Sequence, residues 1–191
     1  MAVLHRERVL RAATTSFLAH GYRSSVDEIA RRAGVAKQTV YHHFPNKDEL
    51  FKEVARELAQ RVLVELESPP ANVRDGLLRF SLAYRQRTLG AQGISAFRTL
   101  VPEVPRFRAV ARTMYGNSAG EMVRRLAEYL ERAMDAGELR RDDAHFGAEM
   151  LLSMLAGLDR MKRLFSVTNE GESEARRTAR IVDCFLRAYE K

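Results

Sequence analysis

Apolar residues recur at three- and four-residue spacing along most of the chain, which is the pattern of amphipathic helices packed against a core. In residues 5–20 this stripe ends at Gly21, and a glycine commonly closes a helix. No convincing run of alternating β-branched residues, no Asn-Gly or Asp-Gly hairpin turn and no internal repeat interrupts the pattern. The pattern therefore predicts an all-α fold.

Capping signals and helix breakers set the boundaries of the predicted helices. Ser25 and Glu28 have the spacing of a capping box, in which each side chain bonds the other residue's amide, and Asn46 and Glu49 have it again. We expect helices over approximately residues 5–20, 26–33, 36–44, 47–66, 72–89, 94–101, 105–115, 118–136, 142–165 and 173–190, with a polar loop at 167–172.

The clearest break in the chain is the stretch Ser68-Pro69-Pro70, because a helix does not continue through two prolines. The long helix before this break is expected to couple two domains. We place an N-terminal domain at residues 1–50 and a second helical domain at residues 51–191.

Composition narrows the class of protein. Of the 191 residues, 46% are hydrophobic and 30% charged, which is typical of a globular chain. The longest apolar stretch, residues 150–158, is far shorter than the ~20 residues that span a bilayer, and the first residues are too charged for a signal peptide. Cys184 is the only cysteine, which excludes an intrachain disulfide and fits a reducing compartment. We expect a cytoplasmic protein that binds no membrane.

Positive charge is concentrated in the first quarter of the chain. Residues 1–47 contain eight Lys or Arg and three acidic residues, a net +5 out of +7 for the whole chain. A local excess of this size indicates an anionic partner such as nucleic acid.

The two short helices predicted within residues 26–44, joined by a turn at Gly34-Val35, form a helix-turn-helix. The second helix of this motif lies in the DNA major groove with its N-terminal side chains at the base edges. Lys37 and Gln38 occupy that end, and these residue types bond guanine and adenine respectively. Val40 and Phe44 are expected to face the core.

Phosphate contacts are expected around these base-reading positions. Thr39 and Tyr41 offer hydroxyl groups, and Lys47 combines its charge with the free amides at the start of the next helix. Ser24 and Ser25 open the first helix of the pair and are candidates for the same kind of contact.

The stretch FLAHGYRSSVDEIARRAGVAKQTVYHHFPNKDELF, within a similarity that covers about residues 6–55, resembles the DNA-binding domain of the TetR (tetracycline repressor) family. This resemblance implies DNA contacts by Lys37, Gln38, Thr39, Tyr41, His42 and Lys47. Two positions depart from the family pattern. Ala36 stands where Ser or Thr commonly caps the recognition helix, and Gln38 replaces a small residue or proline, which makes it a candidate base reader.

The resemblance also implies a C-terminal helical domain that binds a small molecule and dimerises, and the segment RTLVPEVPRF with the helices after it is similar to the AcrR/AefR-type branch. Candidate pocket residues are aromatic or methionine side chains and two polar residues. At helical spacing the aromatic and methionine residues belong more often to plain core than to a pocket, and the two polar residues either orient a ligand or are satisfied inside the domain. The candidates are Phe80, Tyr84, Phe97, Phe107, Met114, Met122, Phe146, Met150 and Met154, with His145 and Glu149 as the polar pair.

The predicted helix at 142–165 is apolar almost all round, and the helix at 173–190 carries a narrower stripe. Together they are expected to supply a two-fold, four-helix dimer interface, with plain core as the alternative for the first of them.

Metal and enzyme hypotheses find little support. The side chains of His42 and His43 diverge by about 100° on a helix, so they do not chelate one ion. The sequence has no glycine-rich phosphate loop, no nucleophile elbow and no acid pair at a recognisable spacing. We expect no metal, no cofactor and no catalysis.

The interpretation that combines these features is a homodimeric, ligand-responsive repressor of the TetR type. It binds double-stranded DNA at a palindromic operator and is released by a small, hydrophobic effector. The alternative is a constitutive DNA-binding adaptor without an inducer, whose C-terminal domain binds another protein.

Overall fold

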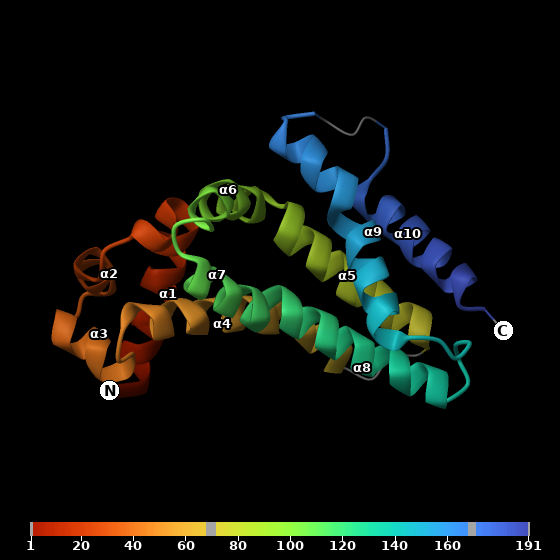
Figure 1. The fold of residues 1–191 in the computed structure, drawn as a ribbon, viewed down its shortest axis with the longest axis horizontal. Coiled ribbons are helices and arrows are strands. Elements are labelled where there is room, and N and C mark those ends of the chain that lie inside the picture. The colour runs from red at the N-terminus through yellow and green to blue at the C-terminus, as the bar shows by residue number, and fades with distance from the viewer. Residues whose placement is uncertain (1, 68–71, 168–170, 191) are drawn as a thin grey trace. The chain divides into compact units, whose positions relative to one another are not determined.

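The computed structural model describes residues 2–67, 72–167 and 171–190 (Figure 1). Every regular element in these ranges is helical, so the all-α prediction is confirmed. The predicted break at 68–70, and residues 168–170 of the predicted polar loop, lie outside the described residues. The α-helices are α1 Ala2–His20, α2 Val26–Ala33, α3 Lys37–His43, α4 Lys47–Glu67, α5 Val73–Leu89, α6 Ala91–Leu100, α7 Arg108–Tyr115, α8 Glu121–Asp135, α9 Ala144–Leu164 and α10 Glu174–Ala188.

Three short helical segments complete the order: η1 Gly21–Arg23 and η2 Val101–Glu103 are 3-10 turns, and η3 Gly116–Gly120 is a π-helical segment. The last of these runs directly from α7 into α8, where the sequence pattern predicts two separate helices. The observed α-helices otherwise begin and end within a few residues of the predicted boundaries.

The helices form two compact units. The first unit contains Met1–Leu58 and Ser95–Ser118, and the second contains Ala59–Ile94 and Ala119–Lys191. Both α4 and α6 contribute residues to each unit. Division into domains at residues 50 and 51 stays a prediction, since these units group spatial neighbours and do not identify segments that fold alone.

The core of the first unit lies where α1, α2, α3 and the start of α4 meet. Phe17 of α1 packs edge-on against Phe51 of α4, with their ring centroids 4.7 Å apart. Apolar side chains from all four helices surround this pair and exclude water from it. The buried residues include Val9, Ala13, Ile29, Ala30, Val40, Phe44, Leu50 and Val54.

The segment that follows α6 belongs to the first unit because it packs on η1. Phe107 contacts the Tyr22 ring at a centroid distance of 4.9 Å, and Arg23 Nε donates to Glu103 at 3.0 Å. Gly21 has a positive φ of 62°, and a Cβ at this position would lie 3.0 Å from Thr99. Pro102 and Pro105 lie on either side of Glu103 in the sequence of this segment.

In the second unit, α5, α8, α9 and α10 pack around one apolar core, where α5 packs against both α9 and α10 and α8 packs along α9 (Figure 1). Gly147 of α9 lies close to Tyr189 at the end of α10, since a Cβ on this glycine would lie 2.8 Å from the Tyr189 hydroxyl. The buried residues include Leu77, Phe80, Leu126, Leu130, Leu151, Leu155, Val182 and Phe185.

A buried ion network joins α5, α9 and α10. The guanidinium of Arg85, 2% exposed, contacts Asp159, 3% exposed, at 2.9 Å and Glu174 at 2.7 Å. Arg177 Nε donates to the same Asp159 carboxylate at 2.6 Å. Burial by itself would raise the pKa of Asp159, but the hydrogen bonds from Arg177 and Arg85 outweigh it and hold this pKa below its usual value. The network fixes three helices of the second unit to one another.

Replacing Asp159 with Asn should leave the buried Arg85 charge poorly compensated. We expect Asp159→Asn to lower the free energy of unfolding by about 3–5 kcal/mol, measured by urea denaturation. Asp183→Asn is the matched control, because it breaks an exposed ion pair with Arg74 and should change stability little. Equal losses in the two variants would contradict the importance of the buried network.

The same contacts predict a pH dependence. Because the pKa of Asp159 is lower in the folded protein than in the unfolded chain, its contribution to stability is present above a pH of about 4, the usual value for aspartate, and is lost as the pH falls further. Denaturation of the wild type and of Asp159→Asn between pH 7 and pH 3 should therefore show their stabilities converging. A constant difference would contradict this assignment.

Candidate nucleic-acid interface

The first two short helices after η1 have the geometry of a helix-turn-helix. Helix α2 ends at Gly34, whose φ of 63° and ψ of 43° lie in the left-handed region that favours glycine. The amide of Val35 then donates to the Ala30 carbonyl at 3.1 Å, which closes the turn. The chain re-enters a helix at Lys37, so α2 and α3 form the motif predicted for residues 26–44.

The helices before and after α3 begin with side-chain caps at the two predicted capping boxes. The Ser25 hydroxyl accepts from the amide of Glu28 at 3.0 Å, and the Asn46 side chain accepts from the amide of Glu49 at 2.9 Å. The N-cap of α3 is Ala36, whose side chain makes no capping bond. The recognition helix therefore starts without the side-chain acceptor that its neighbours have.

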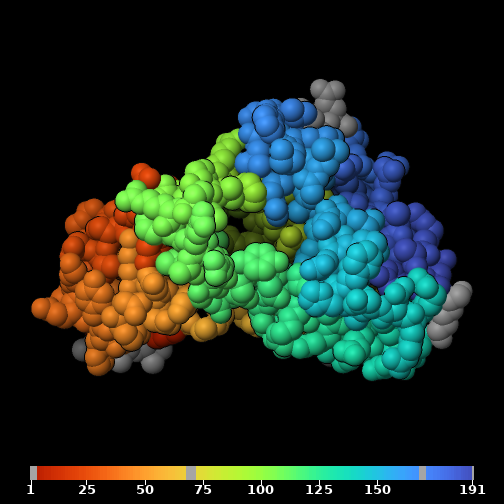
Figure 2. Space-filling view, viewed as in Figure 1, coloured from red at the N-terminus to blue at the C-terminus, as the bar shows by residue number. Residues whose placement is uncertain are grey.

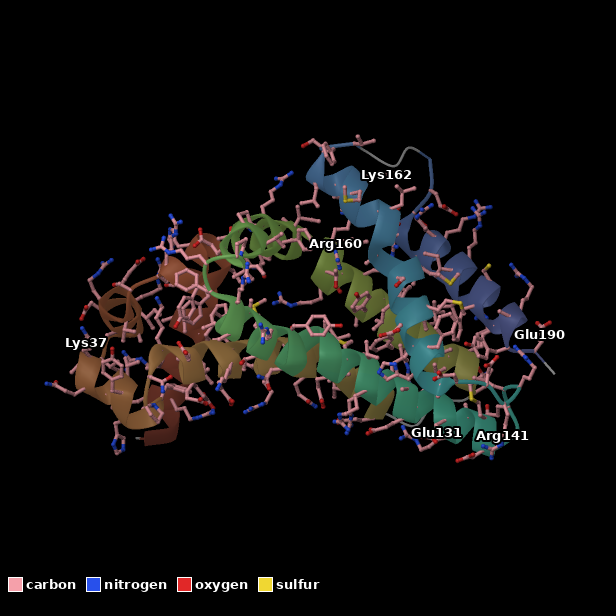
Figure 3. All side chains as sticks on the ribbon, viewed as in Figure 1. Lys37, Glu131, Arg141, Arg160, Lys162 and Glu190 are labelled. Carbon is pink, nitrogen blue, oxygen red and sulfur yellow. The ribbon has the colours of Figure 1, made fainter. Side chains whose placement is uncertain are left out.

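One face of α3 is exposed and carries the predicted base readers. Lys37, Gln38, Tyr41 and His42 are all exposed, with Tyr41 at 41%. Val40 and Phe44 lie on the opposite side and are 1% and 4% exposed, which confirms their predicted place in the core. The half-buried Thr39 lies between the two faces. Figure 3 labels Lys37 where α3 follows α2.

An ion pair across the turn was not anticipated from the sequence. Lys37 Nζ lies 2.9 Å from the Asp27 carboxylate of α2, and both side chains are exposed. The hydrogen bond and the negative charge of Asp27 raise the pKa of Lys37. An ammonium group has three donors, so Lys37 retains capacity for a base while Asp27 orients it. The sequence feature that could have indicated this ion pair is the position of Asp27 in the first turn of one predicted helix and of Lys37 in the first turn of the next.

The start of α4 holds a second cation. Lys47 Nζ lies 4.3 Å from the centroid of the Tyr22 ring, and the Tyr22 hydroxyl donates to Asp48. Burial lowers the pKa of Lys47, opposed by the nearby charge of Asp48. Burial and the hydrogen bond to Asp48 both raise the pKa of Tyr22. These contacts fix the direction of Lys47 at the helix N-terminus, where a phosphate contact is predicted.

The two serines at the start of α2 lie in different surroundings. Ser24 is buried, and its hydroxyl lies 2.8 Å from the Ser16 carbonyl and 3.0 Å from the Gly21 carbonyl. Ser25 is exposed beside the free amides of the first turn. A phosphate contact by the Ser24 hydroxyl would have to replace its internal bonds, so Ser25 is the better placed of the two.

The adjacent histidines differ in their exposure to solvent. His42 is exposed, whereas His43 is half-buried, and their rings meet edge-on with centroids 5.3 Å apart. Burial lowers the pKa of His43, helped by His42, His5 and Arg6. Within the described residues, no three His, Cys, Asp or Glu side chains are grouped so as to hold a metal ion. No helix there is both long and apolar enough to cross a membrane.

The predicted pocket residues are distributed over both units. Phe80 and Met122 lie in the core of the second unit, with Tyr84, Met150 and Met154 packed against it. Phe97, Phe107 and Met114 belong to the first unit. His145, Phe146 and Glu149 lie exposed on α9, where His145 Nδ1 is 3.9 Å from the Glu149 carboxylate. The structure therefore does not bring the whole set together within either unit, and a ligand role for these residues stays a prediction.

Two family models match the chain. The model described as bacterial regulatory proteins, tetR family, matches residues 9–54, and the model described as AefR-like transcriptional repressor, C-terminal domain, matches residues 75–191. The second match covers more than half of the chain and supports the AefR-type branch.

Several curated relatives are transcriptional regulators. An uncharacterized HTH-type transcriptional regulator of Mycobacterium bovis is 30% identical over 148 residues, covering 76% of this chain and 75% of that protein. The match to an HTH-type regulator of Bacillus subtilis is 42% identical over 55 residues, and that to the A-factor receptor protein of Streptomyces griseus is 33% identical over 87 residues. These two matches cover 28% and 44% of this chain, and 29% and 32% of the respective relatives.

Solved structures share the fold over nearly the whole chain. A TetR-family transcriptional regulator from Mesorhizobium loti has a TM-score of 0.78 and 24% identity, covering 100% of this chain and 99% of that one. The flavonoid-responsive regulator FrrA has a TM-score of 0.75 and 28% identity, covering 97% of both chains.

A serine at position 36 should supply the missing cap of α3. The backbone of Ala36 is extended, with φ −69° and ψ 151°, which already suits an N-cap residue. We expect Ala36→Ser to raise the free energy of unfolding by about 0.5–2 kcal/mol in urea denaturation. Ala36→Val is the control, since valine adds volume without an acceptor. A serine variant no more stable than the valine variant would contradict this account of the helix start.

Proposed function

The chain belongs to the TetR family of transcriptional regulators, and from this premise we propose that it is a homodimeric repressor that binds a palindromic operator and is released by a small hydrophobic effector. The observation that carries the proposal is the exposed face of α3, which presents Lys37, Gln38, Tyr41 and His42 from a well-packed, basic unit. Such a repressor acts in the cytoplasm, where its DNA lies, and carries out no catalysis.

In the proposed complex, α3 enters the major groove and its side chains divide into two roles. Lys37 and Gln38 read base edges, with Lys37 oriented by Asp27. Thr39, Tyr41, His42 and Lys47, with Ser25 at the start of α2, contact the backbone or the groove wall and fix the register. The rigid first-unit core holds these positions relative to one another.

An uncovered apolar stripe on α9 supports the dimer. Phe146, Leu158, Met161 and Phe165 are exposed at helical spacing, with Leu158 at 68% and Phe165 at 74%. Gly157 lies among them, and a Cβ there would meet nothing within 4 Å. Figure 2 shows α9, in light blue, at the surface of the second unit. A two-fold contact along this stripe would present two recognition helices to successive turns of DNA.

The names of two similar proteins support a small-molecule effector for this chain. FrrA is flavonoid-responsive and the Streptomyces griseus relative is an A-factor receptor, so the proposed effector of this chain belongs to the class of small organic molecules. An effector that prefers one conformer of α4 would change the separation of the two recognition helices. A coupling of about 1–3 kcal/mol changes operator affinity by about 5- to 150-fold.

The exposed stripe on α9 also admits a second candidate function. A constitutive DNA-binding adaptor would cover Leu158 and Phe165 with another protein and would need no effector. Purified chain that is a dimer without any partner favours the repressor, and a monomer favours the adaptor.

Base readers and phosphate contacts should respond differently to truncation. We expect Lys37→Ala or Gln38→Ala to lower operator affinity by about 1–3 kcal/mol while affecting random DNA less, because each loses a base contact. Lys47→Ala should weaken binding to both duplexes alike. Fluorescence anisotropy on the two DNAs tests this. Equal losses on operator and random DNA for Lys37→Ala and Gln38→Ala would exclude base reading by these residues.

Placing a charge in the α9 stripe should separate the protomers. We expect Leu158→Glu to shift the mass measured by light scattering from dimer to monomer and to weaken operator binding. Val64→Glu is the matched control, because Val64 is exposed on α4, outside the stripe. If Leu158→Glu remained a dimer, the interface would have to lie elsewhere.

A further inference from the structure

An open groove of about 470 Å³ lies between α1 and the C-terminal end of α2 in the first unit. Each helix contributes two arginines to it, Arg8 and Arg11 from α1 and Arg31 and Arg32 from α2. The other lining residues are uncharged: Ala12, Thr15, Ala33 and Gly34. Four guanidinium groups thus line one concave surface without an acidic side chain among them.

Six of the eight Lys and Arg side chains in residues 1–47 contact a carboxylate, a backbone carbonyl or an aromatic ring. Two of the eight differ: in the part of the chain that the structure describes, the side chains of Arg11 and Arg31 have neither an ion pair nor a hydrogen bond. Both of these arginines line the groove. The six partnered cations are Arg6 with Glu53, Arg8 with the Gly34 carbonyl, Arg23 with Glu103, Arg32 with Glu28, Lys37 with Asp27, and Lys47 with the Tyr22 ring.

The other two arginines of the groove are held in place. Arg8 Nη2 donates to the Gly34 carbonyl at 3.1 Å, and a Cβ on Gly34 would lie 2.4 Å from that nitrogen. Arg32 lies 3.3 Å from the Glu28 carboxylate, one helical turn away. The groove therefore combines two positioned guanidinium groups with two uncompensated ones.

Stabilisation of the α2 C-terminus explains the presence of only two of the four arginines in the groove. Basic residues in a last helical turn interact favourably with the helix dipole, which accounts for Arg31 and Arg32. The helix dipole does not account for Arg11, because Arg11 lies in the middle of a different helix, α1. The four like charges on this surface repel one another, and in the part of the chain that the structure describes only Arg32 of the four pairs with a carboxylate, that of Glu28.

We propose that this groove binds phosphate groups, held chiefly by Arg11 and Arg31. A guanidinium group offers paired N–H donors that match the oxygens of a phosphate, and a phosphate carries enough charge to offset several arginines. The phosphate comes either from the DNA backbone beyond the bases that α3 reads or from a free phosphorylated molecule. The first source rests on the proposed function, and the second does not.

The DNA source is tested by the salt dependence of binding. Full-length wild type is compared with the double variant Arg11→Gln/Arg31→Gln on one duplex, by fluorescence anisotropy between 50 and 200 mM salt. Two lost phosphate contacts lower the steepness of log affinity against log salt by about 1.8. The wild type should then lose about 12-fold more affinity than the variant over this range. The control is Arg124→Gln/Arg141→Gln, which removes two exposed arginines of the second unit and should keep the wild-type slope.

The free-phosphate source is tested without DNA, by titrating pyrophosphate into each protein in a calorimeter. A reduced salt slope in the groove variant supports the DNA backbone as the source. An unchanged slope, with pyrophosphate binding lost only in the groove variant, supports a free phosphorylated ligand. Wild-type slope together with wild-type pyrophosphate behaviour would overturn the proposal.

Failure of the groove proposal can be distinguished from failure of the proposed function. A salt slope can be measured on random as well as on selected DNA, so it does not require a known operator. Failure of the proposed function would appear as equal wild-type affinity for selected and random duplexes. Circular dichroism of both double variants checks that the glutamine substitutions leave the helical fold intact.

Discussion

The arrangement of the first unit depends on the left-handed turn at Gly34. Because this residue turns the chain directly after α2, α3 begins at Lys37 with Val40 and Phe44 buried in the core and Lys37 and Gln38 exposed. A side chain at this position would be strained by the positive φ and would also displace the guanidinium of Arg8. One backbone conformation thus sets the recognition face and shapes the end of the arginine-lined groove. The carbonyl of the same residue holds Arg8, so the turn and the groove are parts of one structure.

Local signals explain how much of the fold could be predicted from the sequence. The caps at Ser25 and Asn46 and the glycine at position 34 act within a few residues of themselves, so they located α2 and α4 closely. The grouping of Ser95–Ser118 with the first unit could not be predicted in this way. It depends on contacts between residues about 80 positions apart, such as Arg23 with Glu103, which no periodicity encodes. The buried network around Asp159 was missed for the same reason.

The candidate site was predictable where it depends on helical spacing, and less so where it depends on neighbours. The outward direction of Lys37, Gln38 and Tyr41 follows from a helix whose other face is apolar. The pairing of Lys37 with Asp27 and the burial of the Ser24 hydroxyl arise from the packing of separate segments. The predicted pocket shows this limit most clearly, because residues such as Phe80 and Phe107 share a pattern but belong to different units.

The central claim is that the exposed face of α3 reads a particular DNA sequence as part of a two-fold dimer. The most direct measurement is repeated selection of duplexes from a random library by the full chain, followed by sequencing of the retained DNA. The account predicts an enriched inverted repeat whose half-sites lie about one helical turn, or a multiple of it, apart. Retention of DNA without any enriched sequence would contradict it.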